Sequence, residues 1–138
     1  MSHQFEIPVS QKLIMLMLRA KRHMYAASQP WQLTPMQAML LISIGPGTDK
    51  TMNELSNMMC CDASNTTGLI DRLEAGGYIE RTSDKSDRRV KKIRLSKSGV
   101  ACCEVILESL HKSEALGLAG LSEDDIKSLN TITGKLAL

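Results

Sequence analysis

The chain has 138 residues, of which 43% are hydrophobic and 23% charged, and its net charge is +2. This is the composition of one ordinary globular domain and excludes disorder and collagen-like order. Only 3% of the residues are aromatic whereas nine are methionine, which favours packed helices over a sandwich or a barrel. Arg19, Lys21 and Arg22 interrupt the longest apolar run near the N-terminus, so we expect no membrane span, no secretion signal and a cytoplasmic location.

The small net charge hides an asymmetry along the chain. Residues 81–97 contain eight basic and two acidic residues and carry +6, whereas the remainder carries −4. A local basic block on a balanced body suggests one surface that binds a polyanion. A solvated charged hairpin without a partner would show the same composition.

Two helices are predicted in the N-terminal third. Apolar residues follow a helical rhythm from Val9 to Ser28, and this apolar face is wider than one packing neighbour needs. Thr34-Pro35-Met36-Gln37 predicts the start of the next helix, because it combines a capping box with proline at the first helical position. Gly45-Pro46-Gly47 predicts where that helix ends.

Two shorter helices follow, joined by a tight turn. The capping box Thr51-Met52-Asn53-Glu54 opens the first of them. Its residues expected to face inward are Leu55, Met58 and Met59. Asp62 is the predicted cap of the second, which runs from Ala63 to about Ala75 and ends at Gly76-Gly77. The apolar stripe of this second helix consists of Thr66, Leu69, Ile70 and Leu73.

The C-terminal half begins with a predicted β-hairpin. Residues 78–82 and 90–95 have strand patterns, and the loop between them, 83–89, is polar and basic. Ser96 is the predicted cap of a long helix from Lys97 to about Leu116. A last helix starts after Ser122 and continues through Leu136.

Two short helices and a basic hairpin, in this order, predict a winged helix-turn-helix in a mainly α (α+β) fold. In that motif the second helix enters the major groove of DNA with its N-terminal residues leading. Ser64, Asn65 and Thr67 lie there, and short polar side chains contact phosphates and base edges. The same three residues are equally suited to cap and first-turn interactions within the protein.

Residues 33–101 resemble the MarR family of bacterial and archaeal transcription regulators. The similar segments occur in the family's order and spacing: LTPMQAMLL (33–41), NELSNMM (53–59) and DASNTTGLIDRLEAGGYIERTSDKSDRRVKKIRLSKSG (62–99). Most specific are the block DRLEAGGYIER at 71–81, the triplet DRR at 87–89 and LSKSG at 95–99. The resemblance implies one MarR-type domain over 1–138, divided into a reading head at 33–99 and dimerisation helices at 9–30 and 97–138.

The resemblance implies that the second helix and the hairpin, or wing, contact double-stranded DNA. The residues expected to do so are Ser64, Asn65, Thr67, Arg72, Lys85, Arg88, Arg89 and Lys91. It also implies that Asp71 pairs with a wing arginine, here Arg89, and we expect Arg72 to pair with Asp87, which would fix the angle between wing and helix. Gly68 departs from the family, in which a larger and frequently basic residue is common there, so we expect affinity to depend more on the wing.

The resemblance further implies a homodimer that regulates genes through a palindromic operator and is released by a small anionic or phenolic ligand or by oxidation. We expect a repressor, with an activator as the alternative. The family's ligand crevice lies between the dimerisation helices and the reading head. Four residues flank this junction and are effector-site candidates: Arg19, His23, Tyr25 and Trp31. An ordinary surface or hinge role explains these four residues equally well.

Two other function classes are weaker. A winged helix that binds only protein would make poor use of the basic wing. We find no nucleophile–base pair, phosphate loop or paired carboxylates, so we expect no enzyme activity, no catalytic residue and no cofactor.

The four cysteines form two adjacent pairs, Cys60-Cys61 and Cys102-Cys103, which do not match the spacing of a zinc site. We therefore expect no metal, and buried free thiols as the default. Cys60 and Cys61 precede the second helix, whose dipole lowers a thiol pKa while Asp62 opposes this effect. Oxidation there would displace that helix, so both are redox-sensing candidates.

Overall fold

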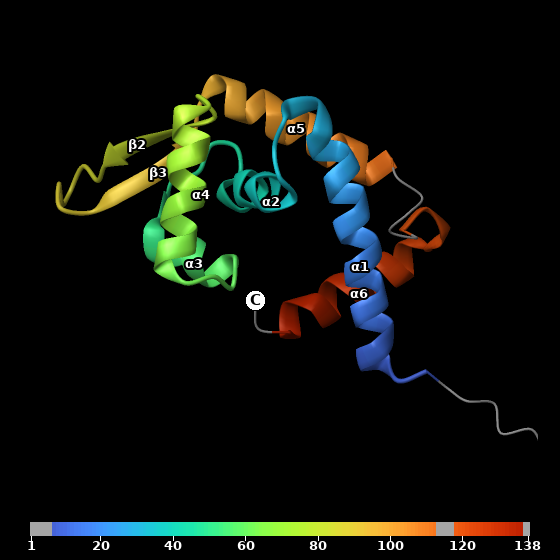
Figure 1. Cartoon of the computed structure of the whole chain (residues 1–138). Coiled ribbons are helices and arrows are strands. Elements are labelled where there is room, and N and C mark those ends of the chain that lie inside the picture. Colours follow the sequence, from blue (N-terminus) through green and yellow to red (C-terminus); the bar gives the residue numbers. More distant parts are fainter. Residues whose placement is uncertain (1–6, 113–117, 137–138) are drawn as a thin grey trace, which may run out of the picture.

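The computed structural model describes residues 7–112 and 118–136, and these residues form a mostly helical fold with one small sheet (Figure 1). The helices and strands follow in the order α1 (Val9–Ser28), α2 (Pro35–Ile44), β1 (Lys50–Thr51), α3 (Met52–Met58), α4 (Ala63–Ala75), β2 (Ile79–Ser83), β3 (Lys91–Leu95), α5 (Lys97–Lys112) and α6 (Glu123–Lys135). Short 3-10 turns occupy Gln29–Trp31 and Leu118–Gly120. No helix of the described residues is long and apolar enough to cross a membrane.

The predicted helix starts are confirmed because local capping groups define them. Thr34 Oγ1 accepts the Gln37 N–H at 3.3 Å, and Gln37 Oε1 accepts the Thr34 N–H at 2.8 Å. Thr51 and Glu54 form the second reciprocal pair, and Asp62 accepts the Asn65 N–H at 2.7 Å. Each cap satisfies amide groups that the helix itself leaves unpaired.

The sheet contains one strand more than the sequence predicts. The predicted hairpin is present with slightly shifted bounds, β2 at 79–83 and β3 at 91–95, and it pairs Arg81 with Ile93. The additional strand, β1, has two residues and pairs Lys50 with Ile93 on the other edge of β3, which gives the antiparallel order β1-β3-β2. Two residues carry no alternation of apolar and polar positions, so no sequence signal marks β1.

One hydrophobic core joins α2 to the elements around it. Its fully buried large residues come from α2, α3, α4, β3 and α5: Leu40, Leu41, Ile44, Leu55, Ile70, Leu73, Ile93 and Ile106. The prediction that Met58 faces inward is wrong, since its side chain is 51% exposed. Helix α3 has seven residues and buries only Leu55, and the chain turns at Cys60 (φ 49°) directly afterwards, so its last turn lies at the surface.

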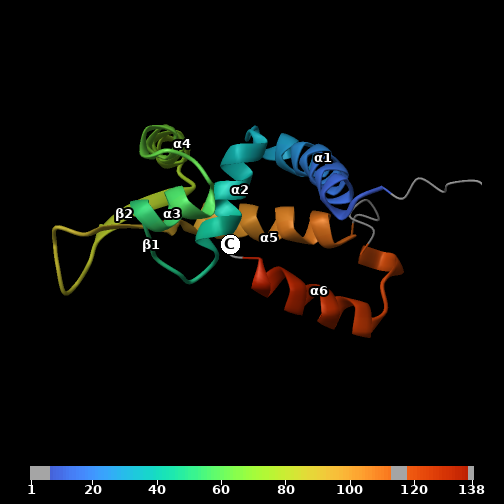
Figure 2. The same cartoon turned by 90° about the horizontal axis from the view of Figure 1, so that it is seen from below.

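The two ends of the molecule are joined through α5. Helices α1 and α6 lie on the side opposite the β2–β3 hairpin, and α5 runs between the two sides (Figures 1 and 2). At the hairpin end Ser96 caps α5, and its hydroxyl also donates to the Gly77 carbonyl at 2.6 Å. The predicted continuation of α5 beyond Lys112 falls on residues outside the described part of the chain.

Candidate nucleic-acid interface

The N-terminal half of α4 presents polar side chains in a fixed arrangement. Asp62 caps the helix and its second carboxylate oxygen accepts a hydrogen bond from Asn65 Nδ2 at 3.0 Å. This contact orients the Asn65 amide while leaving one N–H and the carbonyl oxygen for another partner. Thr67 donates its hydroxyl to the Ala63 carbonyl at 2.7 Å, so its remaining acceptor capacity and its methyl group face outward.

The predicted DNA-contacting residues of α4 share its exposed side. Ser64, Asn65, Thr67 and Arg72 are exposed, whereas Thr66, Ile70 and Leu73 are buried in the core. Thr66 is a buried polar residue whose hydroxyl is satisfied by the Asp62 carbonyl at 3.0 Å. The helix therefore separates a packing face from a polar outer face, as a helix that contacts a second molecule requires.

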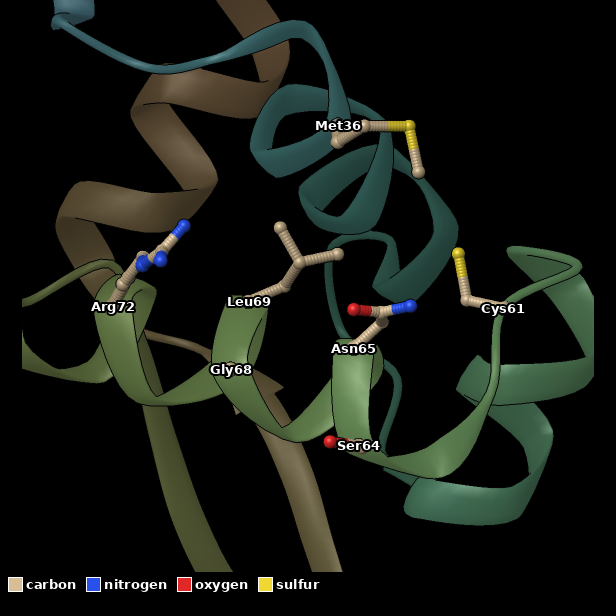
Figure 3. A pocket seen from close by; sticks show the side chains of 7 residues that line it. All are labelled: Met36, Cys61, Ser64, Asn65, Gly68, Leu69 and Arg72. Carbon is tan, nitrogen blue, oxygen red and sulfur yellow. The ribbon is translucent and has the colours of Figure 1, made fainter.

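A groove of about 310 Å³ lies along this outer face, between α4 and the start of α2. Its lining consists of Met36, Cys61, Ser64, Asn65, Gly68, Leu69 and Arg72. Asn65, Leu69 and Arg72 project from α4 toward α2, where Met36 lies, and Ser64 points the other way (Figure 3). No local pattern indicates that Met36 contributes to this surface, because the contact depends on how α2 crosses α4.

The base of the wing is held by ion pairs. Arg94 lies 3.1 Å from Asp49. Lys92 pairs with Asp84, and this ammonium, with the Ser86 hydroxyl, holds the pKa of the Asp84 carboxyl well below its ordinary value. Asp84 also accepts the Ser86 N–H at 2.7 Å, which shapes the loop. A second groove, of about 290 Å³, is lined by both ion pairs and by Ser86, so that its positive and negative charges compensate each other.

Asp71 pairs with a wing arginine as predicted, but the partner is Arg81 of β2 rather than Arg89 at the tip, and Arg81 also bridges to Glu74. The predicted pair between Arg72 and Asp87 is wrong. Asp87 accepts the backbone N–H of Arg89 at 2.9 Å within its own loop and forms no ion pair with Arg72. The tight turn after α4 leads directly into β2, so Arg81 comes back alongside α4 while the tip extends away from it.

These pairs divide the wing cations into two groups. Arg81, Lys92 and Arg94 are neutralised by carboxylates. Within the described residues, the cations without a carboxylate partner include the five predicted to contact DNA: Arg72, Lys85, Arg88, Arg89 and Lys91. Lys91 donates to the neutral Ser83 hydroxyl at 2.9 Å and keeps its charge uncompensated. These five residues place unpaired positive charge at the wing tip and beside α4, while other unpaired cations of the described residues, such as Lys21 and Arg22, lie on α1.

The cysteines differ sharply in environment. Cys60 is exposed, so the expectation of a buried thiol is wrong there, and the half-buried Cys61 donates to the Met59 carbonyl at 3.3 Å. Cys102 and Cys103 are buried, and burial raises the pKa of Cys102 to about 11. Among the described residues no group of three or more His, Cys, Asp or Glu side chains is placed to hold a metal ion.

Of the effector-site candidates, His23, Tyr25 and Trp31 lie near the α1–α2 junction, whereas Arg19 lies in the middle of α1. Arg19 and Tyr25 are exposed, and His23 and Trp31 are half-buried. Tyr78 donates its hydroxyl to the Trp31 carbonyl at 3.2 Å, which ties this junction to the turn between α4 and β2. The Trp31 indole N–H is buried without a hydrogen-bond partner.

Known proteins share this sequence pattern. The MarR family model matches residues 33–91. The HTH-type transcriptional repressor MdtR of Bacillus subtilis (strain 168) is 32% identical over 104 residues, 75% of this chain and 67% of that protein. The multiple antibiotic resistance protein MarR of Escherichia coli (strain K12) is 25% identical over 134 residues, 94% of this chain and 91% of that protein.

The predicted fold is confirmed by solved structures. The crystal structure of a mutant MarR from Escherichia coli complexed with operator DNA matches with a TM-score of 0.71 and 24% identity, over 96% of this chain and 95% of that chain. The winged helix-turn-helix predicted from the order of elements is therefore present. The sequence relatives, among them MdtR at 32% identity over 75% of this chain, together with the family model show that the chain belongs to the MarR family.

Proposed function

We propose that this chain is a sequence-specific DNA-binding transcriptional repressor. The observation that carries the proposal is the grouping of uncompensated cations at the wing tip and beside the exposed polar end of α4. Phosphate binding needs positive charge that is not already paired, and base recognition needs short polar side chains on a helix that fits the major groove. The reading head at 33–99 supplies both.

The two parts of this surface have different roles in the proposal. Ser64, Asn65 and Thr67 contact base edges and phosphates from the major groove, and Arg72 lies on the same helix. Lys85, Arg88, Arg89 and Lys91 follow the phosphate backbone, with Arg88 and Arg89 at the minor groove. The first group determines which sequence is preferred and the second contributes affinity for all sequences.

The exposed apolar face of α1 supports a homodimer. Leu13, Ile14, Leu16, Met17 and Leu18 are 42–67% exposed in the single chain. Apolar residues of α6 are exposed too, among them Ile132 at 54%. A continuous exposed apolar face of this kind marks an interface. We propose that 9–30 and 97–138 form it, so that two reading heads bind the half-sites of a palindrome.

Release from DNA is proposed to occur by displacement of α4, through a small ligand or through oxidation. A ligand at Arg19, His23, Tyr25 and Trp31 would act through the Tyr78–Trp31 hydrogen bond. Oxidation would act at Cys60 or Cys61, directly before α4. Peroxide that weakens DNA binding by the wild type but not by the double variant Cys60→Ser/Cys61→Ser assigns release to the thiols; unchanged wild-type binding excludes them.

The DNA-binding proposal is tested by the salt dependence of affinity for duplex DNA. Replacement of Arg88 and Arg89 by Ala should reduce the slope of log affinity against log salt by about 0.9 for each phosphate that the variant no longer neutralises. The matched control is Lys112→Ala/Lys127→Ala, which removes the same charge from α5 and α6 and should leave the slope unchanged. A wing variant with the wild-type slope and altered sequence preference would contradict the assigned roles.

A further inference from the structure

Gly68 occupies a position where the fold does not require glycine. It lies in the middle of α4, and glycine inside a helix is disfavoured relative to alanine by a factor of about five in the folding equilibrium. Its φ is not positive, and a Cβ added there would meet no atom within 4 Å. At Gly99, by contrast, an added Cβ would lie 1.9 Å from the Tyr78 carbonyl oxygen. Packing explains Gly99 but does not explain Gly68.

The missing side chain deepens the groove on the outer face of α4. Gly68 lines that groove between Asn65 and Arg72, and the helix ribbon there is bare (Figure 3). Leu69 and Met36 give the groove apolar walls, while the Asn65 amide lies at its polar end. The groove therefore offers apolar surface directly beside an oriented hydrogen-bonding group.

This combination matches the major-groove edge of an A·T base pair. Adenine presents the N7 acceptor and the N6 donor, and its partner thymine presents the O4 acceptor and the C5 methyl group. The Asn65 amide, held by Asp62, keeps one N–H donor and its carbonyl acceptor, the complement of adenine. A methyl group beside that pair would meet the apolar walls of the groove.

Resting on the proposed DNA-binding function, we propose that Gly68 is a specificity-determining residue. Its missing side chain admits the C5 methyl group of a thymine between α4 and the DNA, so that α4 selects an A·T pair at this position. A methyl group on the protein at position 68 would occupy the space that the thymine methyl group needs.

The test exchanges one methyl group for another. Duplexes selected by the full-length wild type from a randomised pool are remade with deoxyuridine in place of each thymine in turn. At one position the wild type should lose about fourfold in affinity per half-site, and about fifteenfold when both half-sites are changed, because one buried methyl group is removed each time. Gly68→Ala should bind the thymine duplex at least tenfold more weakly than the wild type does. On the deoxyuridine duplex its affinity should come within about threefold of the affinity of the wild type for the same duplex.

The control is Ala75→Ser at the exposed C-terminal end of α4, outside the residues that line the groove and outside the proposed dimer interface. It should bind both duplexes as the wild type does. Thermal unfolding should show Gly68→Ala at least as stable as the wild type, so its weaker binding is not a folding defect. Equal wild-type affinity for thymine and deoxyuridine at every position, or undiminished binding by Gly68→Ala, overturns the proposal. A pool from which no sequence is enriched overturns the proposed function itself.

Discussion

The two ends of the molecule differ in how far their apolar side chains are buried. In the reading head, Leu40, Leu55, Ile70 and Ile93 are buried almost completely, and the outer face is polar and cationic. Over the first half of α1 the apolar side chains are exposed, and the buried residues of that helix are confined to its C-terminal end: Met24, Ala27 and Ser28. One end buries its apolar side chains within the single chain, whereas the other leaves them exposed, and this exposed face is the basis of the proposed dimer.

This difference shows that the chain has two surfaces made for different chemistry. On the charged surface, the cations without a carboxylate partner are separate from the ion pairs that stabilise the wing. On the apolar surface, the side chains of the first half of α1 are not buried within the single chain. Substitutions in the reading head, in α1, or where α5 connects the two ends should therefore have separable effects on DNA binding, association and stability.

The largest effect is expected at this connection, from Gly99→Ala. The added Cβ would lie 1.9 Å from the Tyr78 carbonyl oxygen, which is backbone, so α5 and the turn before β2 would have to separate. We expect a loss of about 2–4 kcal/mol in the free energy of unfolding, measured by urea denaturation. Gly134→Ala, with open space at its Cβ, should not destabilise the chain; equal losses in both variants would disprove the role of the close approach.

A charge on the apolar face of α1 should weaken dimer association without affecting the fold of the reading head. Leu16 is 42% exposed in the single chain, so Leu16→Glu should leave the helical circular dichroism unchanged. Burying that carboxylate in a dimer interface should weaken association by about 2–3 kcal/mol, measured by sedimentation across protein concentration. Gln11→Glu adds the same charge at a polar position of α1 and serves as the control. A stable wild-type monomer at micromolar concentration would refute the dimer.

At the reading end, Asn65→Ala should change sequence preference without affecting the dimer. It removes the amide that Asp62 orients, and a bidentate contact to adenine contributes about 1–3 kcal/mol of discrimination. Competition between a selected duplex and a scrambled one measures this loss. Reduced affinity for both duplexes by the same factor would show that Asn65 contacts phosphate instead.

The sequence predicts those features that depend on neighbours in the chain. Thr34, Thr51 and Asp62 define helix starts through residues three positions ahead, so the predicted starts of α2, α3 and α4 are correct. The polar loop at the wing tip was predicted as well, because polar residues between two strands extend into solvent. Which of its cations stay unpaired was not predicted, since Arg89 and Arg72 were expected in ion pairs with Asp71 and Asp87. The winged helix-turn-helix is likewise encoded in the order of the elements.

Features that depend on the path of the chain in space were missed. Asp71 finds Arg81 because the turn after α4 returns β2 alongside the helix, and ten residues of separation give no local pattern. The pairs Asp49–Arg94 and Asp84–Lys92 join segments that meet only in the sheet. The groove at Gly68 requires Met36 of α2, whose position relative to α4 is determined by the core.

The smallest effect is expected at the base of the wing, from Asp84→Asn. The ionised carboxylate accepts hydrogen bonds from Lys92 and Ser86, and its pKa is lowered from the ordinary value of 3.8. A group with a lowered pKa in the folded state stabilises the fold above that ordinary value and loses this contribution as pH falls below it. The thermal midpoint of the variant should therefore lie slightly below that of the wild type at pH 7 and pH 5, and the difference should begin to shrink below about pH 3.8. Asp87→Asn removes the same charge from the same loop without breaking an ion pair, so its midpoint should differ less from the wild type. A difference for Asp84→Asn that grows as the pH falls would show that the ion pair with Lys92 does not stabilise the wing, and that the free cations of the tip are positioned by the backbone of the hairpin alone.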